Sequence, residues 1–164
     1  MKILISAATK HGSTGDIASA LGASLERHGC EVVVRAPDEV GHVAGYDAVV
    51  LGSGVYAGRW LGPAKRLIER EQDALAGIPV FLFSSGPLGD PPKPVEEPAD
   101  VAALRARTGA RDHRVFAGRL EKRRLGLAER AIVGAVRAPE GDYRPWAEID
   151  AWAAEIAASL HAPA

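Results

Sequence analysis

Short apolar runs alternate with helical patterns along this chain, and that alternation limits the available folds more than any other feature. The apolar runs are residues 3–5, 31–34, 48–52, 78–83 and 114–118. The run at 48–52 is continuous, which is typical of a strand buried on both faces of a parallel sheet. Strands that alternate with helices predict an α/β fold, in which right-handed crossovers place helices on both faces of a parallel sheet.

Helical patterns fill the intervals between these runs. Ile17, Leu21 and Leu25 recur at the spacing of one helix face. Further helices are expected at residues 63–75, 99–107, 125–136 and 145–160. In the last of these, Trp146 begins an apolar stripe and Trp152 lies near it, so both tryptophans are expected to pack in the core.

The loop between the first strand and the first helix is small and polar. Residues 9–14 include three hydroxyl side chains and Gly12. A helix N-terminus presents unpaired N–H groups and a partial positive charge, so this loop predicts an anion site, most simply for a phosphate. The loop matches neither a Walker A motif nor a GxGxxG dinucleotide motif. An ordinary capped helix after a buried strand is the alternative.

Two further loops rich in glycine and hydroxyl groups follow predicted strands, at residues 53–58 and 84–89. Ligands of open parallel sheets bind outside the carboxyl ends of the strands. The three loops together therefore predict one ligand site at that edge of the sheet. The histidines are scattered without paired ligand spacing, so no metal is expected, and a bound cofactor is expected to carry any chemistry.

The pattern T-x-x-G-x-T-x-x-I-A, which runs from Thr9 to Ala18, resembles the phosphate loop of flavodoxins, which bind flavin mononucleotide (FMN). The resemblance implies a flavodoxin-like three-layer α/β sandwich with a five-stranded parallel sheet in the order 2-1-3-4-5. It also implies non-covalently bound FMN as the cofactor. The first loop would hold the phosphate, and the other two would flank the isoalloxazine ring.

The resemblance implies the following cofactor-binding residues: Thr9, Lys10, His11, Gly12, Ser13, Thr14, Ser53, Gly54, Val55, Tyr56, Ala57, Gly58, Ser84, Ser85, Gly86, Pro87, Leu88 and Gly89. In the third loop, backbone groups would bind the pyrimidine edge. Tyr56 and Trp60 are the candidates to cover a flavin face, because an aromatic plane excludes water and gains stacking energy. A surface position for Tyr56 and a core position for Trp60 are the alternatives. Lys10 and His11 would either add positive charge beside the phosphate or remain solvated.

Residues 119–143 form an insert between the fifth strand and the last helix. The insert begins with a basic cluster of Arg119, Lys122, Arg123 and Arg124. The arrangement resembles the flavodoxin-domain group that includes the menaquinone-dependent protoporphyrinogen IX dehydrogenases, which place a basic helical insert after the fifth strand. The insert is expected to pack on the sheet with solvated arginines. A contact with a partner or a membrane surface through residues 119–137 is the alternative.

Three functions remain open at this stage. The first is electron transfer through FMN to a redox partner protein or a quinone. A protoporphyrinogen IX dehydrogenase that uses a quinone acceptor is a variant of it. The second is an FMN-free module that binds another anion, and the third is a membrane-surface interaction protein. The sequence predicts no oligomeric state.

The composition fits a globular protein of one domain, residues 1–164, with 47% hydrophobic and 25% charged residues. A net charge of −1 excludes a global field that attracts nucleic acid. The single Cys30 fits a reducing compartment and is expected to pack rather than react. The first apolar run is too short for a signal-peptide core, and no run is long enough to span a bilayer. A cytoplasmic location is therefore expected, with membrane association as the alternative.

Overall fold

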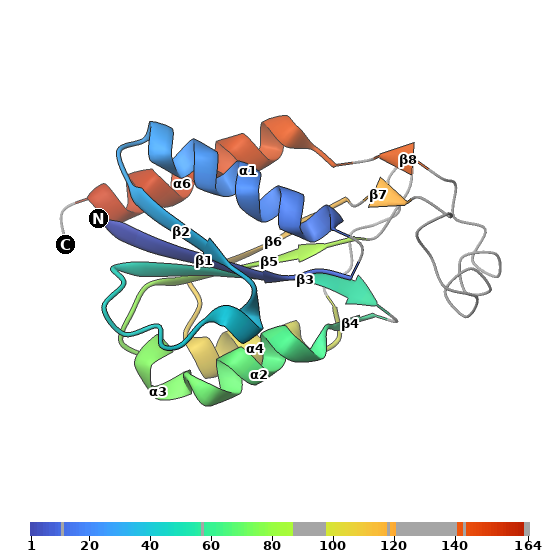
Figure 1. Cartoon of the computed structure of the whole chain (residues 1–164), viewed down its shortest axis with the longest axis horizontal. Coiled ribbons are helices and arrows are strands. Elements are labelled where there is room, and N and C mark those ends of the chain that lie inside the picture. The colour runs from blue at the N-terminus through green and yellow to red at the C-terminus, as the bar shows by residue number, and fades with distance from the viewer. Residues whose placement is uncertain are drawn as a thin grey trace.

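A parallel sheet with the strand order β2-β1-β3-β5-β6 forms the centre of the molecule (Figure 1). The computed structural model describes residues 1–10, 12–56, 58–86, 98–117, 119–120, 141–142 and 144–162. The short strand β4 pairs antiparallel with the end of β3 and lies off the main path of the sheet. Without β4, this order is the predicted 2-1-3-4-5, so the flavodoxin-like fold is confirmed.

The strands of the sheet are β1 (Lys2–Ala8), β2 (Glu31–Arg35), β3 (Ala48–Tyr56), β4 (Arg59–Trp60), β5 (Val80–Ser85) and β6 (Asp112–Phe116). The helices are α1 (Ser13–Arg27), the 3₁₀ turn η1 (Pro37–Glu39), α2 (Gly62–Arg70), α3 (Gln72–Leu75), α4 (Val101–Thr108) and α6 (Trp146–His161). A separate antiparallel pair joins β7 (Arg119–Leu120) to β8 (Gly141–Asp142).

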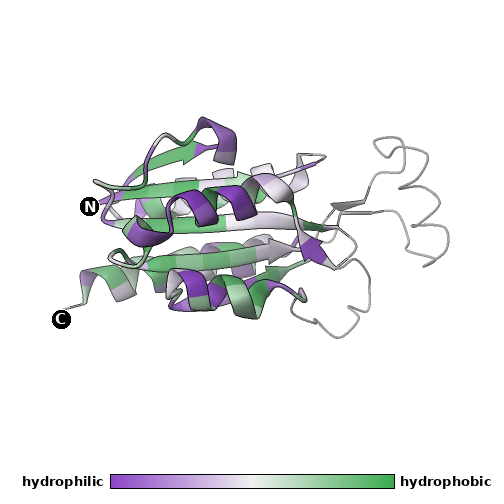
Figure 2. Cartoon of the chain, turned by 90° about the horizontal axis from the view of Figure 1, so that it is seen from below, coloured by the Kyte–Doolittle hydropathy of each residue, from purple (hydrophilic) through white to green (hydrophobic). Residues whose placement is uncertain are grey.

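Helices cover both faces of the sheet, with α1 and α6 on one face and α2, α3 and α4 on the other (Figure 1). Side chains of a strand alternate between the faces. Accordingly, Ile3 and Ile5 pack in the cluster beneath α1 and α6, whereas Leu4 packs in the cluster beneath α2. The strands are strongly hydrophobic over much of their length and the helices carry their hydrophilic residues outward (Figure 2). Both faces are thus closed, which directs a ligand to the ends of the strands.

Several sequence expectations need correction. The single helix expected at residues 63–75 is two helices, α2 and α3, that meet at Glu71. Trp146 is 43% exposed and lies against the Arg144 guanidinium, so it does not belong to the core stripe, whereas Trp152 is fully buried. The two ends of the insert pair as the strands β7 and β8, a pairing that the sequence analysis did not predict. The helix expected at residues 125–136 lies outside the described residues.

Glu71 lies at the break between α2 and α3, with a backbone φ of −106° and ψ of 15°. Its carboxylate is only 7% exposed, accepts a hydrogen bond from the Val43 N–H (3.2 Å) and lies 3.2 Å from His42 Nδ1. Burial raises the pKa of this carboxyl, but the bonds from Val43 and His42 and the charge of Arg70 outweigh it, so the pKa of Glu71 is lowered. Glu71 therefore joins the segment that contains His42 and Val43, which follows β2 and η1, to the α2–α3 helices.

The Asp112 side chain connects the edge strand β6 to α6 by hydrogen bonds. Its carboxylate accepts hydrogen bonds from Trp152 Nε1 and Arg114 Nε, each 3.0 Å long. Burial raises the pKa of Asp112, and these two donors together with the positive charge of Arg114 lower it by more.

Among the described residues, no helix is both long and apolar enough to cross a membrane.

Candidate functional site

The carboxyl ends of β1, β3 and β5 lie side by side, so the three predicted loops leave the sheet at one edge. Parallel pairing places Ala8 beside Ser53, and Gly54 beside Ser85. These registers continue to the last residues of β1 and β5, where the hydrophobic pattern of β3 has changed to Gly52-Ser53-Gly54. The convergence of the three strand ends, on which the sequence-based prediction depends, is therefore present.

The first loop turns tightly around Gly12. The Gly12 N–H donates to Thr9 Oγ1 (2.9 Å), and Gly12 has φ +86°, which favours glycine. The chain then enters α1 at Ser13, and no side chain caps this helix end. The N–H groups of the first turn of α1 consequently face the loop, and Lys10 lies in the same loop. This donor set suits an anion.

Two contacts join the first loop to the end of β3. Thr14 is 4% exposed, and its hydroxyl oxygen would lie only 3.1 Å from a Cβ atom added at Gly54, so the absence of a side chain there allows the close approach. The Lys10 ammonium lies over the ring of Tyr56, 4.2 Å from its centroid. The predicted phosphate loop and the predicted ring-binding loop are therefore in direct contact.

Of the third predicted loop, residues 84–85 belong to β5, and the chain leaves the strand at Gly86, whose φ of +114° favours glycine. The Gly86 N–H donates to the Phe116 carbonyl of the neighbouring strand (2.7 Å), and a Cβ atom at Gly86 would lie 3.8 Å from Val55. Beyond residues 87–97, the Ala99 N–H donates to the Gly58 carbonyl (3.1 Å). The bond from Ala99 therefore links the chain after residues 87–97 to the second loop at Gly58.

Buried polar side chains support these strand ends from inside. The Ser84 hydroxyl, which is fully buried, accepts a hydrogen bond from Trp60 Nε1 (2.8 Å) and lies 2.8 Å from His113 Nε2. The Ser53 hydroxyl, also fully buried, accepts from the Leu61 N–H (2.9 Å) and donates to the Gly54 carbonyl (2.8 Å). Trp60 is 3% exposed, so it occupies the core position that was the alternative to flavin contact.

The expected bounds of two loops need correction, because residues 53–56 belong to β3 and residues 84–85 belong to β5. The described members of the predicted site lie at this edge of the sheet, in these two strand ends, in the first loop with the start of α1, and at Gly58 and Gly86. They are Thr9, Lys10, Gly12, Ser13, Thr14, Ser53, Gly54, Val55, Tyr56, Gly58, Ser84, Ser85 and Gly86. Their roles toward a cofactor stay predictions. Five predicted members lie outside the described residues: His11, Ala57, Pro87, Leu88 and Gly89.

Sequence reasoning missed two sets of residues that support the site. Asp100 accepts from the Trp60 N–H (3.2 Å) and pairs with the Lys65 ammonium (3.2 Å), which fixes the hairpin of β3 and β4. Arg144, whose side chain is 7% exposed, pairs with Asp16 in the first turn of α1 (3.0 Å). The partners are 40 and 128 residues apart in the chain, so no local pattern identifies them.

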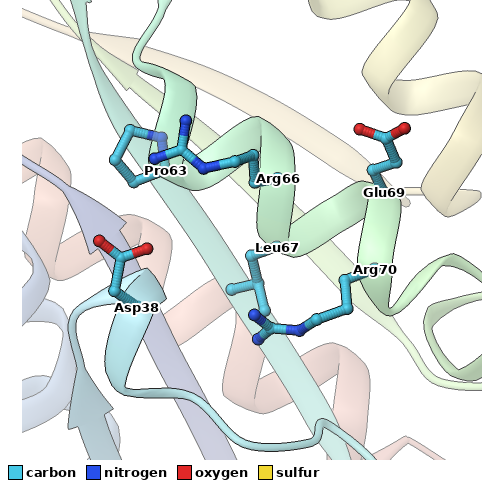
Figure 3. Close-up of a pocket in the computed structure, with 6 residues that line it drawn as sticks. All are labelled: Asp38, Pro63, Arg66, Leu67, Glu69 and Arg70. Atoms are coloured by element: carbon cyan, nitrogen blue, oxygen red, sulfur yellow. The ribbon is translucent and has the colours of Figure 1, made fainter.

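A cavity of about 360 Å³ lies between η1 and α2, and none of its lining residues belongs to the three loops (Figure 3). It is lined by Asp38, Pro63, Arg66, Leu67, Glu69 and Arg70. Figure 3 shows Asp38 projecting from η1 while the two arginines come from α2. The cavity is lined by charged side chains of both signs, in contrast with the cationic first loop.

In the described part of the chain, no group of three or more histidine, cysteine or acidic side chains is placed to hold a metal ion.

Comparison with known proteins agrees with this geometry. A family model described as a flavodoxin domain matches residues 4–145. A flavodoxin from the domain Archaea has a TM-score of 0.68 at 16% identity, over 99% of this chain and 100% of that chain. Oxidised Flavodoxin 1 from Bacillus cereus has a TM-score of 0.64 at 13% identity, over 99% of this chain and 100% of that chain.

The fold also occurs within larger proteins. The rubredoxin oxygen:oxidoreductase of Desulfovibrio gigas has a TM-score of 0.64 at 17% identity, over 97% of this chain but only 36% of that chain. No curated protein sequence gives a significant match. These structural likenesses show the fold, while the family model covers most of the chain. The chain therefore belongs to the flavodoxin domain family.

Proposed function

We propose that this chain binds FMN non-covalently at the three strand ends and transfers electrons through it to a redox partner protein or a quinone. The observation that carries the proposal is the double contact between the first loop and the end of β3. Thr14 approaches Gly54, and Lys10 lies on Tyr56. A phosphate site and an aromatic platform are thus next to each other, as a flavin nucleotide requires.

Each described part of the site has a role in this proposal. The first-turn N–H groups of α1, the Thr14 hydroxyl and the Lys10 ammonium hold the phosphate, because all are hydrogen-bond donors and the helix end is electropositive. Tyr56 stacks on the ring, and the backbone of residues 84–86 binds its polar edge. When bound, FMN supplies the one- and two-electron chemistry. The residues of this chain position the cofactor and exclude water from it.

Flavin titration tests the proposal. The purified protein is expected to quench the fluorescence of added FMN and to shift its visible absorption bands. Thr14→Ala should weaken FMN binding by about 1–3 kcal/mol, because a phosphate oxygen loses its donor in a buried setting. Thr108→Ala is the matched control, because Thr108 is similarly buried, 1% exposed, and its hydroxyl bonds Leu104 within α4.

Either of two results would contradict the assignment. Protein that neither carries nor takes up FMN would remove the flavin proposal altogether. Equal FMN affinity in the Thr14→Ala variant and the unmodified chain would contradict the placement of the phosphate in the first loop.

A protoporphyrinogen IX dehydrogenase that uses a quinone is a second candidate. The observation in its favour is the antiparallel pairing of β7 with β8, which brings together the two ends of the insert, residues 119–143. In this second candidate, the insert supplies the contacts that select a substrate. Turnover of protoporphyrinogen IX with a quinone, compared with flavin reduction by a reductase, separates an enzyme from a carrier.

A further inference from the structure

Lys10 and Tyr56 belong to different parts of the proposed FMN site, yet they contact each other. The Lys10 Nζ atom lies 4.2 Å from the centroid of the Tyr56 ring, within the range of about 6 Å for a cation–π interaction. Lys10 follows β1, and Tyr56 is the last residue of the adjacent strand β3. The ammonium therefore covers the face of Tyr56 that is turned toward the first loop.

That face is the one a flavin nucleotide would use. A ligand whose phosphate lies in the first loop reaches Tyr56 from the side of that loop. An ammonium group and a flat ring cannot occupy the same face of Tyr56 together. A flavin that stacks there must displace Lys10 and break its contact with the ring.

We propose that this exchange makes Lys10 the residue that discriminates FMN from riboflavin, an inference that rests on the proposed function. FMN carries a phosphate, so it brings an anion into the same loop as the ammonium that leaves Tyr56. Riboflavin has the same ring without the phosphate, so its binding breaks the contact and supplies no replacement. Lys10 thus strengthens the binding of FMN and weakens the binding of riboflavin.

Replacement of Lys10 should therefore move the two affinities in opposite directions, because a contact shifts binding only by its difference between the two states. In Lys10→Gln, riboflavin no longer breaks a cation–π contact, and its affinity should rise about two- to fivefold. FMN loses a charge-assisted phosphate contact, and its affinity should fall about tenfold. The preference for FMN over riboflavin should decrease by about 20- to 50-fold.

The experiment titrates FMN and riboflavin into the full chain, stripped of any bound flavin, and follows the quenching of flavin fluorescence. Lys2→Gln is the matched control: the Lys2 ammonium lies 5.4 Å from the centroid of Tyr46, at the opposite end of β1. This control should leave both affinities unchanged. Raising the salt concentration should weaken FMN binding more in the unmodified chain than in Lys10→Gln.

The outcomes separate this inference from the function on which it rests. Tighter riboflavin binding together with weaker FMN binding in Lys10→Gln supports the inference. A riboflavin affinity that stays constant or falls overturns it, even if FMN binds the unmodified chain as proposed. If the unmodified chain binds neither flavin, both the inference and the proposed function fail.

Discussion

Gly52 provides the sharpest test of the packing beneath the site. It lies in β3 just before the second loop, and a Cβ atom built there would lie 2.2 Å from two carbons of the Phe83 ring. Ordinary carbon contacts are about 3.5–4.0 Å, so the ring or the strand must move by more than ~1 Å. Phe83 is fully buried and packs against Phe116 and Trp152, at centroid distances of 6.3 and 6.2 Å, so its ring has little freedom to move.

Gly52→Ala should therefore destabilise the protein by about 2–3 kcal/mol, near the upper end of the usual cost of overpacking a core. In a domain of this size that corresponds to a decrease in Tm of about 5–10 °C. Urea denaturation followed by far-ultraviolet circular dichroism would measure the change as a lower midpoint at constant slope. Gly41→Ala is the control, because a Cβ atom at Gly41 meets nothing within 4 Å.

A double variant identifies the cause. Phe83→Leu removes the ring that the new methyl group would meet, so Gly52→Ala should cost at least about 1 kcal/mol less in that background. If the Gly52→Ala variant unfolds within about 0.5 kcal/mol of the unmodified chain, the packing argument is refuted. Additive effects in the double variant would show that the cost does not come from Phe83.

The remaining predictions concern single features of the fold and the insert. Glu71→Gln should reduce the free energy of unfolding by about 1–2 kcal/mol at pH 7. Because the folded-state pKa of Glu71 is lowered, its contribution is present above the unfolded pKa and disappears as pH falls through the folded value, so denaturation curves of the two proteins should converge in acid. Ser84→Ala should cost about 1–3 kcal/mol, measured by urea denaturation, because two buried partners lose a bond, whereas Ser85→Ala leaves that network intact. Liposome flotation tests the basic insert: equal recovery of the unmodified chain and the variant with Arg123 and Arg124 changed to Glu would exclude a membrane role for these arginines.

The strand–helix alternation and the three loops could be predicted because their signals are local. A continuous apolar run such as Ala48–Leu51 indicates a buried strand. The glycine and hydroxyl residues after it were expected to form a loop, but β3 continues through Gly52-Ser53-Gly54 to Tyr56. The flavodoxin-like strand order followed from the resemblance of the first loop. These features depend on residues close together in the chain, where residue type and spacing decide the structure.

The parts that escaped prediction depend on partners that are distant in the chain. At the break between α2 and α3, the Glu71 carboxylate accepts a hydrogen bond from the Val43 N–H, 28 residues earlier, and helix periodicity alone gives no sign of this contact. The core position of Trp60 depends on Ser84, 24 residues later. Trp146 matched the periodicity of the last helix but lies at its first residue, where a side chain extends beyond the packed layer. In each case tertiary contact overrides the local pattern.

The polar residues at the strand ends form two groups: one group binds partners inside the protein, and the other contacts the face where a ligand is proposed to bind. The hydroxyls of Ser53 and Ser84 are fully buried and bond groups inside the protein, so the contribution of these residues to a ligand falls to their backbones. Thr14 and Lys10, by contrast, contact the face shared by the first two loops. Substitutions in the first group should therefore change stability, and those in the second group should change ligand affinity. The inner group thus holds the ends of β3 and β5 in place, because Ser53 and Ser84 are bonded within the core.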